Sequence, residues 1–218
     1  MINNKFIAIE GIEGSGKTES CKIIYNILKN YGIKNILIVR EPGGTSIAEK
    51  IRKIIISFNK NEKLNKKTEL FLIYASRIQL VETIIKPALK KGYIVIGDRH
   101  DLSSLAYQGG GLGIDLNIIR TLKKIAIDNF SPSLTIYLDI DPIIGLQRIK
   151  SRKYLDRIEN KDISFFINTR NSYLKLIKNN PKIVTINTSQ KKSIVQNHLE
   201  LIIKKWIKEQ TVYNGIRG

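Results

Sequence analysis

Eight consecutive residues near the N-terminus match the pattern G-x-x-x-x-G-K-[ST], which forms phosphate-binding loops in nucleotide-binding proteins. An apolar, strand-like run, Phe6-Ile7-Ala8-Ile9, directly precedes them. Glycines let successive backbone N–H groups surround phosphate oxygens, the lysine reaches the outer phosphates, and the threonine hydroxyl can ligate Mg²⁺ at a helix N-terminus. We therefore expect a nucleotide phosphate site rather than a Gly-rich turn without a ligand, formed by Gly11, Ile12, Glu13, Gly14, Ser15, Gly16, Lys17 and Thr18.

Charged residues also follow the next two strand-like runs. In the turn Arg40-Glu41-Pro42-Gly43-Gly44-Thr45, the proline and glycines fix the path of a charged pair beside the phosphate loop. In Asp98-Arg99-His100, the aspartate leaves a buried strand and can face Mg²⁺, while Arg99 faces an anion. A structural salt bridge is the alternative interpretation of this pair.

Two further segments complete the candidate site. Asp101 to Ser104, followed by Ala106 to Gly111, places an aromatic, an amide and a flexible loop near the same cleft. A basic segment beyond it carries Arg148, Lys150, Arg152, Lys153 and Arg157, together with Asp156, and can close over a triphosphate as a lid. Phosphoryl transfer needs such cations because its transition state spreads negative charge over the equatorial oxygens. Positive charge in both the loops and the lid indicates two phosphate-bearing substrates, as in a nucleoside monophosphate kinase.

Hydrophobic periodicity places these segments on an α/β fold. Alternating strands and helices predict a parallel sheet with helices on both faces and functional loops at the carboxyl ends of the strands. We expect one domain over residues 1–210, a lid at about 148–160, and a frayed tail over 211–218, after a helix that ends at Trp206, Ile207 and Lys208. The expected strands are Phe6–Glu10, Ile36–Arg40, Tyr93–Gly97, Leu134–Asp139 and Lys182–Asn187, and the expected helices are Glu19–Tyr31, Ile47–Phe58, Glu69–Lys91, Leu116–Asn129 and Asp162–Lys178.

The distribution of charged residues argues against a specific nucleic-acid partner. Lys and Arg number 37 against 19 Asp and Glu, a formal charge of +18, but the lysines are scattered among Ile and Asn without an aromatic-interleaved basic patch. Solvated surface lysines explain this better than a specific nucleic-acid site.

The chain has no run of ~20 apolar residues and no signal-like start, so we expect a cytoplasmic protein without a membrane span. Cys21 is expected to be a small core residue.

Taken together, the motifs closely resemble the bacterial thymidylate kinase family. The resemblance runs from Phe6 to about Lys208 and is carried in order by the segments Ile9–Thr18, Arg40–Thr45, Ile96–Leu102, Ala106–Gly111, Leu134–Asp139 and Leu155–Glu159. It implies the P-loop nucleoside-monophosphate-kinase fold with a five-stranded parallel sheet, a homodimer, ATP with Mg²⁺, and phosphorylation of dTMP to dTDP for dTTP synthesis.

The resemblance also implies roles for individual residues. Arg52 and Arg99 grip the dTMP phosphate, Arg77 and Gln108 contact the edge of the thymine, and Tyr107 lies beside C2′ and disfavours a ribose 2′-hydroxyl. Glu13 lies near the 3′-hydroxyl, and Asp98 supports either Mg²⁺, with Thr18, or the phosphate-binding arginines. The acceptor site as a whole comprises Glu13, Glu41, Arg52, Ile73, Arg77, Arg99, Ser103, Ser104, Tyr107 and Gln108, and the catalytic set is Lys17, Asp98, Arg99, Arg148 and Arg152.

Four positions, Glu13, Ile73, Phe71 and Glu19, need separate treatment. Because the phosphate loop carries Glu13 where some relatives have a basic residue, the lid must supply the catalytic arginine, with Arg152 the first choice, Arg148 the second, and Arg157 able to lock the closed lid instead. Ile73 stands where the family usually stacks a phenylalanine on thymine, which predicts weaker dTMP binding. Phe71 is expected in the core and Glu19 is expected to face outward.

Other functions share part of this pattern. A GTP-hydrolysing switch needs a guanine-reading N-K-x-D motif, which is missing from the sequence. A nucleic-acid-dependent ATPase would use the basic charge and predicts salt-sensitive DNA binding. A non-catalytic nucleotide-binding protein would not need the lid arginines. A kinase for a related nucleotide is the leading enzymatic alternative.

Overall fold

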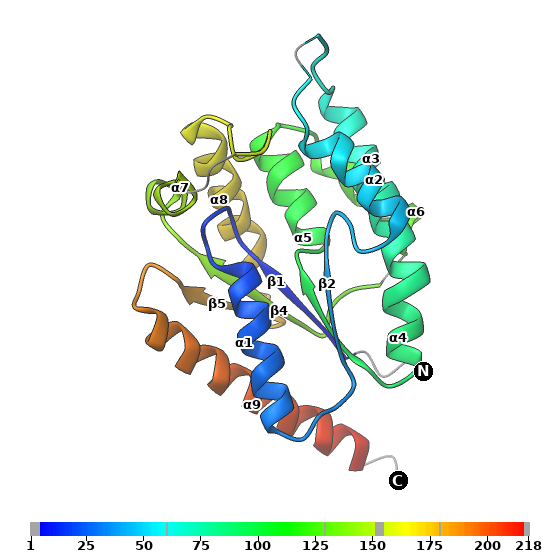
Figure 1. Ribbon diagram of the computed structural model, residues 1–218, viewed down its shortest axis with the longest axis vertical. Coiled ribbons are helices and arrows are strands. Elements are labelled where there is room, and N and C mark those ends of the chain that lie inside the picture. The colour runs from blue at the N-terminus through cyan, green and yellow to red at the C-terminus, as the bar shows by residue number, and fades with distance from the viewer. Residues whose placement is uncertain (1–4, 60, 129, 151–154, 179, 216–218) are drawn as a thin grey trace.

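The computed structural model describes residues 5–59, 61–128, 130–150, 155–178 and 180–215, and five parallel strands within these ranges form one sheet (Figure 1). The strand order is β2-β3-β1-β4-β5. The predicted five-stranded parallel α/β fold is therefore confirmed, with each strand beginning and ending within one residue of its expected position. The strands are β1 Phe6–Glu10, β2 Ile36–Arg40, β3 Ile94–Asp98, β4 Leu134–Asp139 and β5 Ile183–Asn187.

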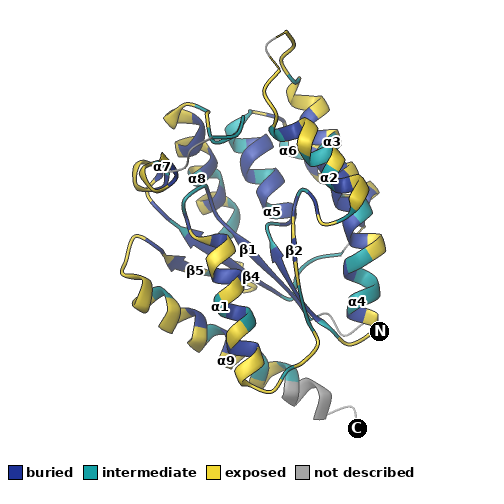
Figure 2. Ribbon diagram, viewed as in Figure 1, coloured by how far each residue is buried: buried dark blue, intermediate teal, exposed yellow. Residues whose placement is uncertain are grey.

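Alternate residues of β1 enter two different cores, because successive side chains of a strand point to opposite faces. Ile7 and Ile9 belong to the core beneath α1 (Lys17–Asn30) and α9 (Lys192–Gly215). Phe6 and Ala8 belong to the core on the opposite face. Helices thus cover both faces, and the central strands are buried along their length (Figure 2).

The opposite face is covered by further helical elements. A long helical segment begins as α3 at Lys66, passes through the π-helical η1 and ends with α4 at Lys90, close to the expected helix over 69–91. In Figure 1, α2, α3 and α6 lie on one side of the sheet, and α8 lies nearer to β5. These elements are α2 Ser46–Ile56, α3 Lys66–Leu80, η1 Val81–Ile85, α4 Lys86–Lys90, α6 Leu116–Ile127 and α8 Ile163–Ile177.

The segment after β3 corrects one expectation. Residues 106–111, expected as a flexible loop, form most of η2 (Leu105–Gly111), a π-helical continuation of α5 (Asp101–Ser104). A Cβ added to Gly110 would lie 2.3 Å from Ser172 Cβ, and one added to Gly111 would lie 2.5 Å from Phe165 Cε2. These glycines therefore allow α8 to pack closely against η2, and the absence of side chains serves contact rather than flexibility.

Two core assignments had opposite outcomes. Cys21 is buried, as expected, and burial raises the pKa of its thiol. Phe71 is 57% exposed, so its assignment to the core was wrong. The inner face of α3 is formed by Leu70 and Tyr74, which lie one turn apart, and Phe71 is rotated out of that face by about 100°.

The C-terminal helix is longer than the sequence indicates. α9 continues past Lys208 to Gly215, and fraying of residues 211–218 stays a prediction. Helix α7 (Pro142–Lys150) comes before α8 in the chain. The basic segment that starts at Arg148 therefore begins inside a helix. Among the helices of the described ranges, none has both the length and the apolar character that a membrane crossing requires.

The packing of α9 on the sheet can be tested by two leucines on that helix. Leu199 is fully buried in the core shared with α1, whereas Leu201 is 65% exposed. Leu199→Ala is expected to lower the free energy of unfolding by about 2–5 kcal/mol because it leaves a cavity. Leu201→Ala, the matched control, is expected to change it by less than about 0.5 kcal/mol. Equal unfolding midpoints in urea would contradict this packing.

Candidate active site

The phosphate loop joins β1 to α1 and is shaped by its glycines. Gly11, Gly14 and Gly16 have φ values of 146°, 73° and 89°, which other residues rarely adopt. A Cβ on Gly14 would lie 2.1 Å from the carbonyl oxygen of Gly145 in α7, so only glycine allows this approach. Lys17 Nζ donates to Ile12 O at 2.8 Å, which folds the amino group back over the loop.

The two predicted metal ligands lie next to each other. Strands β1 and β3 are neighbours with Ile9 opposite Asp98, which brings the end of β3 beside the phosphate loop. Thr18 Oγ1 donates to Asp98 Oδ2 at 2.7 Å. Hydroxyl and carboxylate oxygens suit Mg²⁺, which also retains water and phosphate ligands. Within the described ranges, no group of three or more His, Cys, Asp or Glu side chains is arranged to hold a metal.

Arg99 lies at the centre of the cleft in a strained conformation, with φ 75°. Its Nη2 donates to Glu13 Oε1 at 2.6 Å and to the Tyr107 hydroxyl at 3.0 Å, and its Nη1 donates to Gly11 O at 2.9 Å. Tyr107 in turn donates to Glu13 Oε2 at 2.6 Å. The structural salt bridge considered for Asp98 and Arg99 is not formed, since Arg99 pairs with Glu13 and Asp98 accepts from Thr18.

The positive side chains of the cleft lie close enough to repel one another. Burial and the neighbouring charge of Arg99 lower the pKa of Lys17 to about 8. Burial, and then repulsion from Arg40, lower the pKa of Arg52, whose Nη1 donates to Pro42 O at 2.9 Å. Positive groups this close together are stabilised by an anion, so the electrostatics favour phosphate binding.

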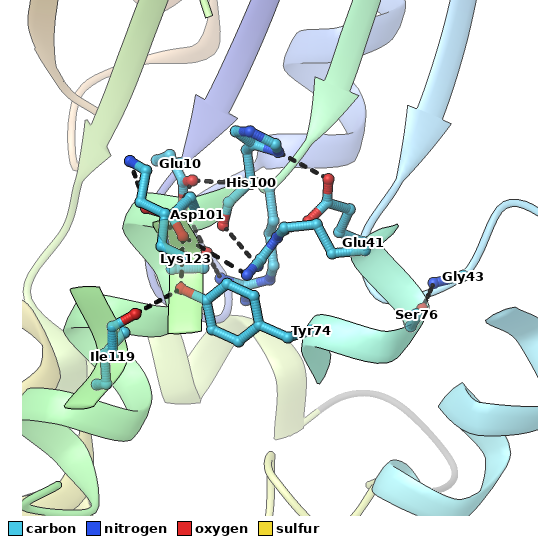
Figure 3. A network of polar contacts seen from close by, with 12 residues as sticks. Glu10, Glu41, Gly43, Tyr74, Ser76, His100, Asp101, Ile119 and Lys123 are labelled. Atoms are coloured by element: carbon cyan, nitrogen blue, oxygen red, sulfur yellow. Dashed lines mark hydrogen bonds and ion pairs between the residues drawn. The ribbon is translucent and has the colours of Figure 1, made fainter. Parts of the chain in front are cut away.

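A buried network fixes Arg77, which is 2% exposed. Its Nε donates to Glu41 Oε2 at 2.6 Å, its Nη2 donates to His100 O at 3.1 Å, and its guanidinium lies 4.6 Å from the Tyr74 ring centroid. Figure 3 shows Glu41, His100, Asp101 and Tyr74 close together in this network. Burial opposes the charge of Glu41, but Arg77 and His100 outweigh it and lower its pKa. Glu41 therefore acts on the site by holding Arg77.

The start of α5 is held by Glu10, a residue that the sequence analysis missed. Its carboxylate accepts from His100 N at 2.8 Å, from Ser103 Oγ at 2.5 Å and from the Tyr173 hydroxyl at 2.8 Å. Burial raises the pKa of Glu10. This arrangement places Ser103 and Ser104 at the cleft.

The cleft has a volume of about 230 Å³, and all ten residues predicted for the acceptor site line it. The buried Nη1 of Arg77 and Oγ of Ser104 have no hydrogen-bond partner. Gln108 Nε2 donates to Glu69 Oε1 at 2.9 Å, which leaves the amide oxygen of Gln108 without a partner among the described residues. These polar atoms and the apolar side chain of Ile73 provide both donors and an acceptor for a flat polar ligand.

The predicted lid contains two described arginines, Arg148 and Arg157. Arg148 Nη2 donates to Thr188 O at 2.9 Å and its Nη1 donates to Gly14 O at 3.3 Å, so its guanidinium lies beside the phosphate loop. Arg157 Nη2 pairs with Glu69 Oε2 at 2.5 Å, which joins the lid to α3. Arg152, the first choice for the catalytic arginine, lies outside the described residues. Glu19, as expected, faces outward and pairs with Lys192 at 2.7 Å.

Glu69 was also missed, although a signal was present. It precedes Ile73 by four residues and Arg77 by eight, so the three share one face of α3. A carboxylate on the face that carries two predicted binding residues is expected to line the same cleft.

The comparisons with known proteins agree on one family. The thymidylate kinase family model matches residues 9–199. A curated thymidylate kinase from Buchnera aphidicola subsp. Schizaphis graminum is 54% identical over 97% of this chain and 100% of its own length. One from Vibrio parahaemolyticus is 47% identical over 96% and 100%. The crystal structure of thymidylate kinase from Ehrlichia chaffeensis is 30% identical, has a TM-score of 0.72, and aligns over 94% of this chain and 98% of that one.

These matches cover the phosphate loop, the cleft and the lid in the order that the sequence predicts. They also agree with the cation-rich cleft, which suits two phosphate-bearing substrates. The chain therefore belongs to the thymidylate kinase family, and it is an ATP-dependent kinase that phosphorylates dTMP to dTDP.

Proposed function

We propose that the cleft binds both substrates end to end, with the ATP phosphates on the loop Gly11–Thr18 and dTMP between Arg52, Arg99 and α3. The observation that carries this proposal is the set of polar atoms without hydrogen-bond partners in the cleft, among them Arg77 Nη1, which lies 3.7 Å from the carboxylate oxygen Asp101 Oδ1. Arg77 Nη1 donates to one carbonyl of thymine, and Gln108 Oε1 accepts from the ring N–H. Ile73 covers the face of the ring without stacking on it.

The sugar and phosphate of dTMP occupy the middle of the cleft. Arg52 and Arg99 bind the acceptor phosphate, which offsets the mutual repulsion of the cations. Glu13 accepts from the 3′-hydroxyl, while Tyr107, fixed by its bond to Glu13, occupies the space beside C2′. Since Glu13 and the phosphate both interact with Arg99, the substrate replaces contacts that already hold this guanidinium in place.

Transfer of the γ-phosphoryl group then depends on charge placed around it. Lys17 binds the outer phosphates, and a lid arginine, Arg152 first and Arg148 second, balances the charge that develops in the transition state. Thr18 and Asp98 are the residues that would hold Mg²⁺, which neutralises charge on the phosphate oxygens when bound. The lid excludes water, which favours transfer to dTMP over hydrolysis.

We also propose a homodimer, formed through the outer faces of α2, α3 and α6. Each of these helices carries two exposed apolar residues seven positions apart, which lie on one stripe. Such stripes on adjacent helices form an apolar surface of the kind that associates. The pairs are Ile47 and Ile54, Phe71 and Ile78, and Ile118 and Ile125.

A place in dTTP synthesis belongs to the same proposal, because dTDP is one phosphoryl transfer short of dTTP. So does a cytoplasmic location, since the reaction consumes ATP. Both rest on the activity and on the expected substrates.

The proposed roles predict the outcome of a coupled ADP-release assay with dTMP, dUMP, dGMP, AMP and UMP. dTMP is expected to give the highest kcat/KM. Arg152→Ala is expected to lower kcat by about 100-fold or more with little change in the KM for dTMP, since the lid charge acts on the transition state. Lys204→Ala removes an exposed cation from α9 and serves as the control. If Arg152→Ala keeps full turnover, the role moves to Arg148.

The lowered pKa of Lys17 predicts a pH dependence for nucleotide binding. In the free enzyme this amine loses its proton as the pH rises through about 8, and bound phosphate favours the charged form. The Kd for ATP is therefore expected to rise by about tenfold between pH 7 and pH 9, with proton uptake on binding. Calorimetry in buffers of different ionisation enthalpy measures both quantities. A Kd that stays constant up to pH 9 would contradict this assignment.

The dimer surface can be tested with a charge on each of two exposed isoleucines. Ile125 is 78% exposed on α6, and Ile125→Glu is expected to weaken self-association by about 100-fold or more because it places an unpaired charge in the apolar surface of each subunit. Ile143, 57% exposed on α7, lies outside the three helices, and Ile143→Glu is the control. Sedimentation velocity measures the oligomeric state of both variants. If Ile125→Glu remains dimeric, the outer faces of α2, α3 and α6 do not form the dimer interface.

A further inference from the structure

Glu69 is a buried carboxylate that lies between the lid and the base site. It lies in the first turn of α3, is 1% exposed and lines the cleft. A buried carboxylate is stable only when its oxygens are paired. Each of its two oxygens has a different partner, and the two partners come from opposite sides of the cleft.

The first partner is Arg157 in the lid. Its Nη2 contacts Glu69 Oε2 at 2.5 Å, while its Nε donates to Ile55 O at 2.7 Å and its backbone N–H donates to Ile56 O at 3.0 Å. The guanidinium thus joins residues 155–158 to the end of α2 and to α3. It also balances the charge of Glu69, so the carboxylate is a paired anion that accepts hydrogen bonds and donates none.

The second partner is Gln108 on η2. Gln108 Nε2 donates to Glu69 Oε1 at 2.9 Å. An amide has one donor end and one acceptor end, and only its donor end can face a carboxylate. The partner therefore determines which end of Gln108 faces the cleft, and the end that remains is the carbonyl oxygen.

This orientation has a consequence for base choice. Thymine carries a hydrogen on N3, which can donate to the Gln108 oxygen, whereas the corresponding nitrogen of cytosine has a lone pair that the same oxygen repels. Arg77 Nη1, which has no hydrogen-bond partner, is a donor and suits the carbonyl at position 4 of thymine but not the amino group of cytosine. The donor and the acceptor of the base site thus match thymine and do not match cytosine.

We propose that Glu69 is a positioning residue that makes Gln108 a hydrogen-bond acceptor toward the base, and that the lid arginine Arg157 holds Glu69 in this role. The proposal deepens the acceptor site described above and rests on the base lying against Gln108. Because lid and base site share one carboxylate, base selection is expected to be complete only when the lid segment contacts α3.

Glu69→Gln tests the proposal because it keeps the shape of the side chain and removes its acceptor-only character. If the new amide uses its oxygen for Arg157, it presents N–H groups to Gln108, whose own amide then turns its donor end to the cleft. The ratio of kcat/KM for dTMP to that for dCMP is expected to fall by about tenfold or more. Glu82→Gln, on the same helical segment with a side chain 48% exposed, is the matched control and should keep the ratio.

Two further variants separate positioning from a merely structural role. Glu69→Asp retains the charge and should preserve more of the ratio than Glu69→Gln, which also gives a reading if the glutamine variant does not fold. Glu69→Gln combined with Gln108→Leu should give the same ratio as Gln108→Leu alone, because Glu69 acts through Gln108. Losses that multiply in the double variant, or a Glu69→Gln ratio within about twofold of the wild type, would overturn the proposal. Absence of dTMP-stimulated ADP release in the wild type would instead count against the kinase assignment.

Discussion

The ion pair between Arg77 and Glu41 sets the geometry on which the rest of the site depends. Both side chains are almost completely buried, where a charge needs a partner of opposite sign. The pair joins α3 to the turn after β2, and the bond from Gly43 N to Ser76 Oγ fixes the same turn a second time. His100 on the next strand's loop completes the arrangement, so three separate segments are placed by one compensated charge.

Pairing of opposite charges also positions other side chains of the cleft. Arg77 and Arg99, two buried cations that the resemblance assigns to the substrate, each have a carboxylate beside them, Glu41 and Glu13. These carboxylates keep the arginines folded and oriented before substrate arrives, which lowers the entropy lost on binding. Preorganisation of this kind is what phosphoryl transfer requires, since the protein's contribution is positioning and charge.

The sequence predicted the parts of this protein that have local signals. The phosphate loop, the strands and the polar residues after each strand follow from motif and periodicity, and the matching register of β1 and β3 brings them together. Glu10 was missed because its role depends on a partner distant in sequence, Tyr173, and the helical spacing of Glu69 places it at the cleft without revealing its distant partner Arg157. Gly110 and Gly111 were misread because the residues that they contact lie on α8, and no local pattern shows such a contact. Phe71 was misplaced since helical spacing gives relative directions but not which direction is inside.

The π-helical form of η2 has an evolutionary consequence. Tyr107 and Gln108 are adjacent in sequence, yet one contacts Glu13 in the phosphate loop and the other contacts Glu69 on α3. The wider turn of a π-helix lets neighbouring residues share a face more fully than an α-helix does, and such segments behave as single-residue insertions into a regular helix. A one-residue deletion within this segment would rotate one of the two side chains out of the cleft. Its length is therefore a property that descent must preserve, in addition to the glycines that pack against α8.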